Sequence, residues 1–291
     1  MASNFPVLTR IGIIGHPTNP MVPEIARKAV DLAENRGIKT FLESPVAKRI
    51  GRPELGFTKK EIGELVELIL VLGGDGSILE AVRSFSREKL PIAGINLGHL
   101  GFLSLGPHSR TEEIIERLYN GTFKIEDRSM LQTLVKRNGK EVYSNIALND
   151  FTIVKEPICR VIELDVSISG TYVNSFRGDG VIFATPTGST AYSLSSGGPI
   201  IPPWVDSLLI TPICSHTLSA RPVITSGQAL LTAVLHCSHS QVDLVTDGQE
   251  GFRIQNDDCI EVQKASEYAK IVVFEKGSFF EVLREKMKWG K

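Results

Sequence analysis

The segment that most restricts how this chain folds is residues 68–83, LILVLGGDGSILEAVR. An apolar run of strand length leads into GGDG at residues 73–76 (the GGDG turn), and apolar side chains then recur on one helical face. This order predicts a strand, a glycine turn and a helix. Glycine tolerates positive φ and admits a phosphate close to the backbone, and the N-terminus of a helix attracts anions. The turn is therefore a candidate phosphate-binding site.

Asp75 is unexpected in such a turn, because a carboxylate repels a phosphate unless it binds a metal or takes a proton. It is a candidate general base, or an anchor for Mg²⁺ or for a sugar hydroxyl. The structural alternative is an aspartate that caps the helix at Ile78 or Leu79. The four residues of the turn leave both alternatives open.

The composition argues against several classes of protein. The net charge is −1, from 32 basic and 33 acidic residues, which argues against nucleic-acid binding by bulk electrostatics. No apolar run has membrane-spanning length, and the first residues lack the pattern of a signal peptide. The 4 cysteines have no CxxC spacing, which is typical of reduced thiols. We expect a cytoplasmic protein with neither nucleic-acid nor membrane partners.

Strand and helix patterns alternate through the first 124 residues, which indicates a parallel sheet covered by helices. Capping-box spacing at Thr58 and again at Ser109 predicts that a helix begins near each of these residues. Ligands of such sheets bind beyond the carboxyl ends of the strands, where the GGDG turn is placed. The predicted strands are residues 11–15, 38–42, 68–72 and 91–95, and the first helix begins near Pro23.

From about residue 125 the pattern changes to short strands and turns. Asn138-Gly139 and Ser169-Gly170 predict two hairpins, over residues 130–146 and 161–176. Further strands are predicted at residues 208–213, 229–235, 241–245, 260–262 and 271–274, and a helix near 279–287. We expect an α/β plus all-β protein: an α/β domain in residues 1–124, an all-β domain in 125–265, and a segment 266–291 that packs back on the first domain.

The all-β region contains an unusually polar, glycine-rich stretch, RGDG at 177–180 followed by TPTGSTAYSLSSGGP at 185–199. Hydroxyls and exposed amides suit the recognition of ribose, amide and phosphate groups. Within it, Tyr192 either stacks on a base or fills the core. Alone the stretch is compatible with a solvated loop, but together with the GGDG turn it indicates a nucleotide cleft between the domains.

Histidines invite two further assignments. His236 and His239 lie three residues apart, but no other ligand cluster accompanies them, so polar turn residues are favoured over a metal site and none is predicted. His99 follows a predicted strand end, where a phosphate contact and a structural role fit equally well.

These motifs, in this order and over nearly the whole chain, resemble the bacterial NAD kinase (ATP-NAD kinase) family. The GGDG turn is shared with lipid kinases, whereas TPTGSTAYSLS is highly specific. The resemblance rests on GGDG at 73–76, INLGHLGFL at 95–103, Asn149-Asp150, RGDG at 177–180, TPTGSTAYSLSSGGP at 185–199, HTLSARP at 216–222 and DGQ at 247–249.

The resemblance implies a phosphotransferase that moves a phosphoryl group from ATP to the 2′-hydroxyl of the adenosine ribose of NAD. It also implies a Rossmann-like N-terminal α/β domain, a β-sandwich-like C-terminal domain, and a homodimer or homotetramer. Mg²⁺ or another divalent cation is expected to accompany ATP and to offset the repulsion between Asp75 and the donor phosphates.

The resemblance also implies roles for individual residues. Asp75 matches the general base that takes the proton of the ribose hydroxyl, and Gly73, Gly74 and Gly76 match the turn that phosphate approaches. The implied NAD-binding residues are Asp75, Gly76, Asn149, Asp150, Arg160, Arg177, Asp179, Thr187, Thr190, Ala191, Tyr192, Ser193, Leu194, Ser195 and Gln249.

The sequence departs from the family pattern at two of these motifs. Asp150 stands where the family has Glu, which keeps the carboxylate but shortens its reach by a methylene, and Ser215 stands where proline usually precedes the histidine of HTLS. Two alternative functions remain. A lipid kinase is disfavoured by the near-neutral charge and the TAYSLS run, and a non-catalytic NAD(P)-binding sensor is disfavoured by the intact Asp75.

Overall fold

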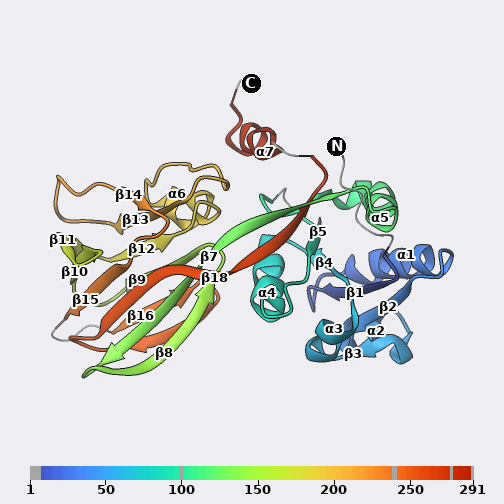
Figure 1. Cartoon of the computed structure of the whole chain (residues 1–291), viewed down its shortest axis with the longest axis horizontal. Helices are drawn as coiled ribbons and strands as arrows, with labels where there is room; N and C mark the ends of the chain where they lie inside the picture. The colour runs from blue at the N-terminus through green and yellow to red at the C-terminus, as the bar shows by residue number, and fades with distance from the viewer. Residues whose placement is uncertain (1–7, 99–100, 238–240, 276–277, 290–291) are drawn as a thin grey trace. The chain divides into compact units, whose positions relative to one another are not determined.

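The computed structural model describes residues 8–98, 101–237, 241–275 and 278–289. Contacts divide the chain into two compact units, with residues 1–127 and 269–291 in unit 1 and residues 128–268 in unit 2. Figure 1 shows the course of the chain. Two long strands, β7 (Lys124–Arg137) and β18 (Cys259–Val273), contribute residues to both units.

Unit 1 is built on a parallel sheet in the order β18-β5-β4-β1-β2-β3, as the alternating sequence pattern predicts. Strand β4 is central and buried at every position, which explains its uninterrupted apolar sequence. The strands are β1 (Arg10–Gly15), β2 (Lys39–Glu43), β3 (Gly56–Phe57), β4 (Leu68–Gly73), β5 (Ile92–Asn96) and, beside β5, the short β6 (Gly106–Pro107).

The helices at residues 22–34, 44–49 and 111–119 bury their apolar faces in one core with the sheet. The capping box predicted at Thr58 is confirmed, whereas the one predicted at Ser109 is wrong. There a 3₁₀ turn comes first, and Thr111 Oγ1 donates to the carbonyl of His108 at 2.6 Å. The helices are α1 (Val22–Glu34), α2 (Ser44–Arg49), α3 (Lys59–Leu65), α4 (Asp75–Phe85), α5 (Thr111–Tyr119) and α7 (Ser278–Met287), with 3₁₀ turns η1 (Pro53–Leu55) and η2 (His108–Arg110).

Unit 2 is a sandwich of two antiparallel sheets whose inner faces form one apolar core. One sheet has the order β11-β10-β15-β18-β7-β8 and the other β14-β13-β12-β9-β16-β17. The predicted α/β plus all-β fold class is therefore confirmed. The strands not yet given are β8 (Lys140–Ala147), β9 (Asp150–Lys155), β10 (Ile162–Ile168), β11 (Thr171–Gly178), β12 (Gly180–Ala184), β13 (Ser207–Ile213), β14 (Val223–Ser226), β15 (Leu231–His236), β16 (Val242–Thr246) and β17 (Glu250–Ile254).

Both predicted hairpins are confirmed, with positive φ at Asn138-Gly139 and Ser169-Gly170. The prediction of separate strands at 260–262 and 271–274 is wrong, because β18 runs continuously through both. Strands β9, β12, β14 and β17 were not anticipated. Strand β12 is buried at every position and shows no alternation of apolar and polar residues, so the periodicity that marks a strand is missing from its sequence.

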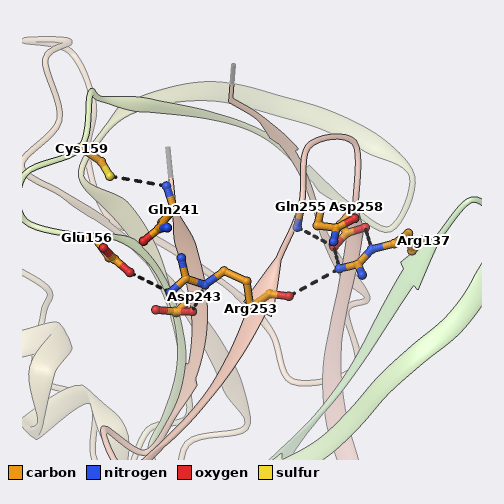
Figure 2. A network of polar contacts seen from close by, with 8 residues as sticks. All are labelled: Arg137, Glu156, Cys159, Gln241, Asp243, Arg253, Gln255 and Asp258. Atoms are coloured by element: carbon orange, nitrogen blue, oxygen red, sulfur yellow. Dashed lines mark hydrogen bonds and ion pairs between the residues drawn. The ribbon is translucent and has the colours of Figure 1, made fainter. Parts of the chain in front are cut away.

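A polar network at one end of unit 2 ties the strands together (Figure 2). Arg137 donates two hydrogen bonds to the buried carboxylate of Asp258, at 2.9 and 2.7 Å, and the amide of Gln255 donates a third at 2.8 Å. Nearby, Arg253 forms an exposed ion pair with Glu156 at 2.7 Å.

No helix among the described residues is long and apolar enough to span a membrane.

Candidate functional site

The GGDG turn joins β4 to α4, with Gly74 as the N-cap and Asp75 as the first helical residue. None of its glycines has a positive φ, so the left-handed conformation that glycine allows is not used. A Cβ at Gly73 would lie 2.3 Å from Oγ of Ser77, whereas a Cβ at Gly74 would meet no heavy atom within 4 Å. Gly73 is therefore needed for internal packing, and Gly74 presents an open backbone to a ligand.

The carboxylate of Asp75 is held by the loop that follows β5. Its Oδ2 accepts the amide of Phe102 at 2.8 Å, and its Oδ1 accepts the amide of Leu103 at 3.2 Å. A Cβ at Gly101 would lie 1.8 Å from Oδ1, so only glycine fits there. The carboxylate thus bonds to another loop, and the amide of Ile78 donates to the carbonyl of Gly74 instead, so the structural alternative that Asp75 caps α4 is wrong.

A cavity of about 110 Å³ lies beside this turn, at the carboxyl ends of β1, β2 and β4. Glu43 and Glu80 contribute carboxylates to its lining, and Lys59 forms an ion pair with each of them. Burial raises the pKa of Glu43, and the charge of Lys59 opposes this effect. Two carboxylates against one ammonium make the cavity unfavourable for phosphate, which leaves the N-terminus of α4 as the candidate anion-binding end of unit 1.

In unit 2, the Asn149-Asp150 motif is clamped by Asp247. The carboxylate of Asp247 accepts the amides of Leu148, Asn149 and Asp150, at 3.2, 2.7 and 3.2 Å. In the sequence Asp247 stood out only as part of the DGQ motif, and this structural role was not predicted. A signal for it was present, since aspartate before glycine at the end of a strand is typical of a turn residue, and Asp247 has a φ of +48°.

Asp150 is almost completely buried within this clamp. Burial, followed by repulsion from Asp247, raises the pKa of Asp150 to about 7, and a hydrogen bond from Thr152 partly opposes the shift. The hydroxyl of Thr152 donates to its Oδ1 at 3.0 Å. Near neutral pH the side chain therefore exists in both protonation states, so it can accept a hydrogen bond from a ligand hydroxyl or donate one.

Asn149 and Thr187 bring the two predicted NAD-binding motifs together. Gly188 lies directly against the backbone of Asn149, since a Cβ at this position would lie 2.1 Å from the carbonyl oxygen of Asn149. The amide of Thr185 donates a hydrogen bond to the same oxygen at 2.9 Å. Oδ1 of Asn149 and Oγ1 of Thr187 are buried and have no hydrogen-bond partner among the described residues. Buried polar atoms are nearly always paired, so two such atoms in adjoining motifs make this a candidate place for a polar ligand.

The TPTGSTAYSLS stretch forms η3 (Gly188–Thr190) and α6 (Tyr192–Ser195). Several of its hydroxyls serve the fold, since Ser193 bonds to Thr211 at 2.8 Å and Thr190 donates to the carbonyl of Thr187 at 3.1 Å. Tyr192 is 44% exposed, so the alternative that it fills the core is wrong. Burial and, after it, the charges of Cys214, Asp179 and Asp150 raise the pKa of Tyr192.

The RGDG motif lies where β11 passes into β12. Arg177 is exposed at the end of β11, and Asp179 pairs with Lys155 at 3.3 Å. A Cβ at Gly180 would lie 1.9 Å from the carbonyl oxygen of Ile153 in the neighbouring strand β9. The glycines of this motif therefore allow strands to approach closely, which leaves Arg177 and Asp179 as its candidate binding groups.

The remaining predicted site residues occupy varied surroundings. Arg160, Ser195 and Gln249 are exposed, and Ala191 and Leu194 are half-buried.

His99 and His239 lie outside the described residues. Within the described part of the chain, no cluster of three His, Cys, Asp or Glu side chains is arranged to hold a metal ion. His236 instead pairs with Asp165, at 2.9 Å.

Comparisons with known proteins match both halves of the chain. The ATP-NAD kinase N-terminal domain model matches residues 11–123, and the ATP-NAD kinase C-terminal domain model matches residues 148–274. The NAD kinase of Geotalea daltonii is 39% identical over 286 residues, which cover 98% of this chain and 100% of that protein. The NAD kinase of Geobacter sulfurreducens is 35% identical over 284 residues, again 98% and 100% of the two chains.

Solved structures agree in fold. Yeast NADH kinase, solved in complex with NADH, has a TM-score of 0.89 at 26% identity and covers 98% of this chain and 89% of its own. An NAD kinase from Archaeoglobus fulgidus, in complex with ATP, has a TM-score of 0.74 at 22% identity and covers 96% and 98% of the two chains. The second likeness supports the fold alone.

Proposed function

The chain belongs to the NAD kinase family, and from this premise we propose how its residues carry out the transfer of a phosphoryl group from ATP to NAD. In the reaction of the family, the 2′-oxygen of the adenosine ribose forms a bond to the γ-phosphorus of ATP. The bond from that phosphorus to the bridging oxygen breaks, and the products are NADP and ADP. Such transfers depend mainly on positioning and on charge neutralisation.

Asp75 is the general base that takes the proton of the ribose 2′-hydroxyl. The observation that carries this proposal is that both carboxylate oxygens of Asp75, the first residue of α4, accept backbone amides of the loop after β5, from Phe102 and Leu103. Each oxygen keeps a lone pair for a substrate hydroxyl, and the two amides fix its orientation. Gly73, Gly74 and Gly76 form the turn that the donor phosphates approach, with Gly74 as the open position.

Unit 2 supplies the NAD-binding groups. The buried, unpaired atoms of Asn149 and Thr187 accept or donate hydrogen bonds to NAD, the carboxyl of Asp150 bonds to a ribose hydroxyl, and the exposed ring of Tyr192 stacks on a base. The other proposed NAD-binding residues are Gly76, Arg160, Arg177, Asp179, Thr190, Ala191, Ser193, Leu194, Ser195 and Gln249.

Mg²⁺ or another divalent cation accompanies ATP in this proposal. Magnesium in kinases is commonly bound by one or two carboxylates together with substrate phosphates, and Asp75 at the phosphate-binding turn is a carboxylate of that kind. When bound, the cation neutralises charge on the donor phosphates. We also propose that the protein is a homodimer or a homotetramer and that it lies in the cytoplasm. Light scattering of the purified protein measures its mass and so distinguishes the two assemblies.

The deciding experiment is an assay for NADP. The purified protein is incubated with ATP, Mg²⁺ and NAD, and NADP is detected with an NADP-specific dehydrogenase, with Asp75→Asn assayed in parallel. Product from the wild type alone supports both the activity and the role of Asp75. A folded protein that binds NAD but makes no product, with ATP or with polyphosphate as donor, would instead support the sensor alternative.

A further inference from the structure

The C-terminal helix α7 contacts the same loop that holds Asp75. The ring centroid of Phe279 lies 6.1 Å from that of Phe102, and Nζ of Lys286 lies 4.5 Å from the centroid of the Phe102 ring. All three residues belong to unit 1. The ring of Phe102 is therefore contacted by two side chains from a helix that lies far from it in the sequence.

The contacts come from one face of α7. Phe279, Leu283 and Lys286 are spaced four and three residues apart, so they lie along the same side of the helix. Leu283 between them is only 2% exposed, which shows that this face is the packed one. The opposite face carries exposed charged residues, among them Glu281 and Glu285. The helix is therefore docked in a defined rotation that presents an aromatic ring and an ammonium to Phe102.

Phe102 connects this docking to Asp75. Its side chain contacts α7, while its own amide donates the 2.8 Å hydrogen bond to Asp75 Oδ2. The neighbouring amide of Leu103 holds the other oxygen, and the space left at Gly101 accommodates the carboxylate. A shift of the Phe102 backbone would therefore turn or release the carboxylate. Misplacement of a reacting group by about 1 Å lowers a reaction rate by about 100-fold.

We propose that Phe279 and Lys286 are positioning residues for the phosphoryl transfer, acting through Phe102 to fix the carboxylate of Asp75. The inference rests on the proposed role of Asp75 as the base. It assigns to the C-terminal helix a part in catalysis, although α7 contributes none of the proposed substrate-binding residues. The contact is aromatic and cation–π in nature, so it depends on the ring at 279 and on a cation at 286.

The first test compares Phe279→Ala with Trp289→Ala in the full chain. Trp289 follows α7 and is 54% exposed. Its replacement by alanine therefore removes an aromatic side chain from the same segment and serves as the matched control. We expect Phe279→Ala to lower kcat about tenfold with little change in the KM for NAD, because the reacting carboxylate is misplaced while binding is retained. Trp289→Ala should leave kcat unchanged. Equal effects of the two variants would overturn the proposal.

The second test separates positioning from general stabilisation. In an Asp75→Asn background, Phe279→Ala should cause no further loss of kcat, because the group that it positions is already absent. A second loss as large as that seen in the wild-type background would show that Phe279 acts elsewhere. Lys286→Arg should retain the rate, because arginine keeps the cation over the ring, and Lys286→Gln should lower it.

Amide hydrogen exchange gives a readout that does not depend on activity. Exchange at the amides of Phe102 and Leu103 should accelerate in Phe279→Ala and in the milder Phe279→Leu, but not in Trp289→Ala. Unchanged exchange in a folded Phe279→Leu protein contradicts the proposed connection. If instead Asp75→Asn keeps its turnover, the role of Asp75 as base fails, while the exchange result still tests whether α7 holds this loop.

Discussion

The amide of Phe102 donates a 2.8 Å hydrogen bond to Oδ2 of Asp75 across 27 residues of sequence. The bond is possible because β4 and β5 are parallel neighbours that pair at Gly73 and Asn96, so the segments that follow them leave the sheet at the same edge. The loop after β5 thus supports the turn after β4. The geometry proposed for catalysis in unit 1 is therefore a property of two adjoining strand ends rather than of the GGDG turn alone.

The substitution Asp75→Asn should abolish most of the activity and leave the fold intact. The amide cannot accept the ribose proton, so kcat should fall by about 10²–10⁴-fold. The exposed Asp31 of α1 provides a matched control, and Asp31→Asn should turn over at the wild-type rate. Steady-state production of NADP measures both. Turnover of Asp75→Asn within a few-fold of the wild type would disprove the base assignment.

The two glycines that open the GGDG turn should respond differently to alanine. Gly73→Ala places a Cβ 2.3 Å from Oγ of Ser77 and should destabilise the protein by about 1–3 kcal/mol. At Gly74 there is open space and an ordinary φ of −97°, so Gly74→Ala should unfold at nearly the wild-type urea concentration. Its KM for ATP should nevertheless rise, because the new methyl group occupies the side that phosphate approaches. An unchanged KM for ATP would remove Gly74 from the donor site.

The sequence predicted the strand, turn and helix around Asp75 because β4 is buried throughout and α4 is amphipathic. It did not predict what Asp75 binds. The partners are backbone amides of Phe102 and Leu103, and every residue type except proline carries an amide, so such a contact leaves no mark in the residue types. The amides of 148–150 that Asp247 accepts were missed for the same reason, although Asp247-Gly248 itself has the sequence of a turn.

Local patterns also failed where tertiary context decided the outcome. Thr58 and Ser109 have the same capping-box spacing, yet only Thr58 forms the box, because a 3₁₀ turn precedes the helix at Thr111. Strand β18 was predicted as two strands because its middle is polar and half-exposed, with Ser266 and Tyr268 exposed on either side of Glu267. The strand nevertheless runs through that stretch, where only the small Ala265 and Ala269 are buried.

Tyr192→Ala should weaken NAD binding without lowering the melting temperature. The ring is 44% exposed, so its removal leaves no large cavity, whereas loss of stacking on a base costs about 1–3 kcal/mol, or tenfold or more in Kd. Tyr172, which is 61% exposed on β11, gives a control substitution, Tyr172→Ala. Calorimetric titration with NAD and thermal unfolding distinguish the outcomes. A lower melting temperature with unchanged affinity would restore a packing role for Tyr192.

The ion pairs drawn in Figure 2 should differ sharply in their contribution to stability. Asp258 has a fully buried side chain and accepts two bonds from Arg137, so Asp258→Ala leaves a charged group without its partner and should cost about 3 kcal/mol. Glu156→Ala breaks the exposed pair with Arg253 and should cost less than about 1 kcal/mol. Urea unfolding of the two variants measures the difference, and similar midpoints would contradict this assignment.

Asp150 should make the free energy of unfolding depend on pH. Its pKa is about 7 in the folded protein against an ordinary value of 3.8, because burial and Asp247 disfavour the charged form. Between these two values the folded state binds more protons than the unfolded state. The stabilisation is therefore complete below about pH 4, and it is lost as the pH rises through 7, by up to about 1.4 kcal/mol per pH unit.

Asp150→Asn isolates this contribution, because asparagine resembles the protonated carboxyl and does not titrate. The variant should be more stable than the wild type at pH 8, and its advantage should shrink steadily as the pH falls from 7 to 5. Urea unfolding at each pH measures the difference, with Asp31→Asn as the exposed control, whose difference from the wild type should not change. A constant difference between Asp150→Asn and the wild type would mean that Asp150 is ionised throughout this range. The carboxylate would then meet NAD as a permanent anion, able only to accept hydrogen bonds from a ribose hydroxyl.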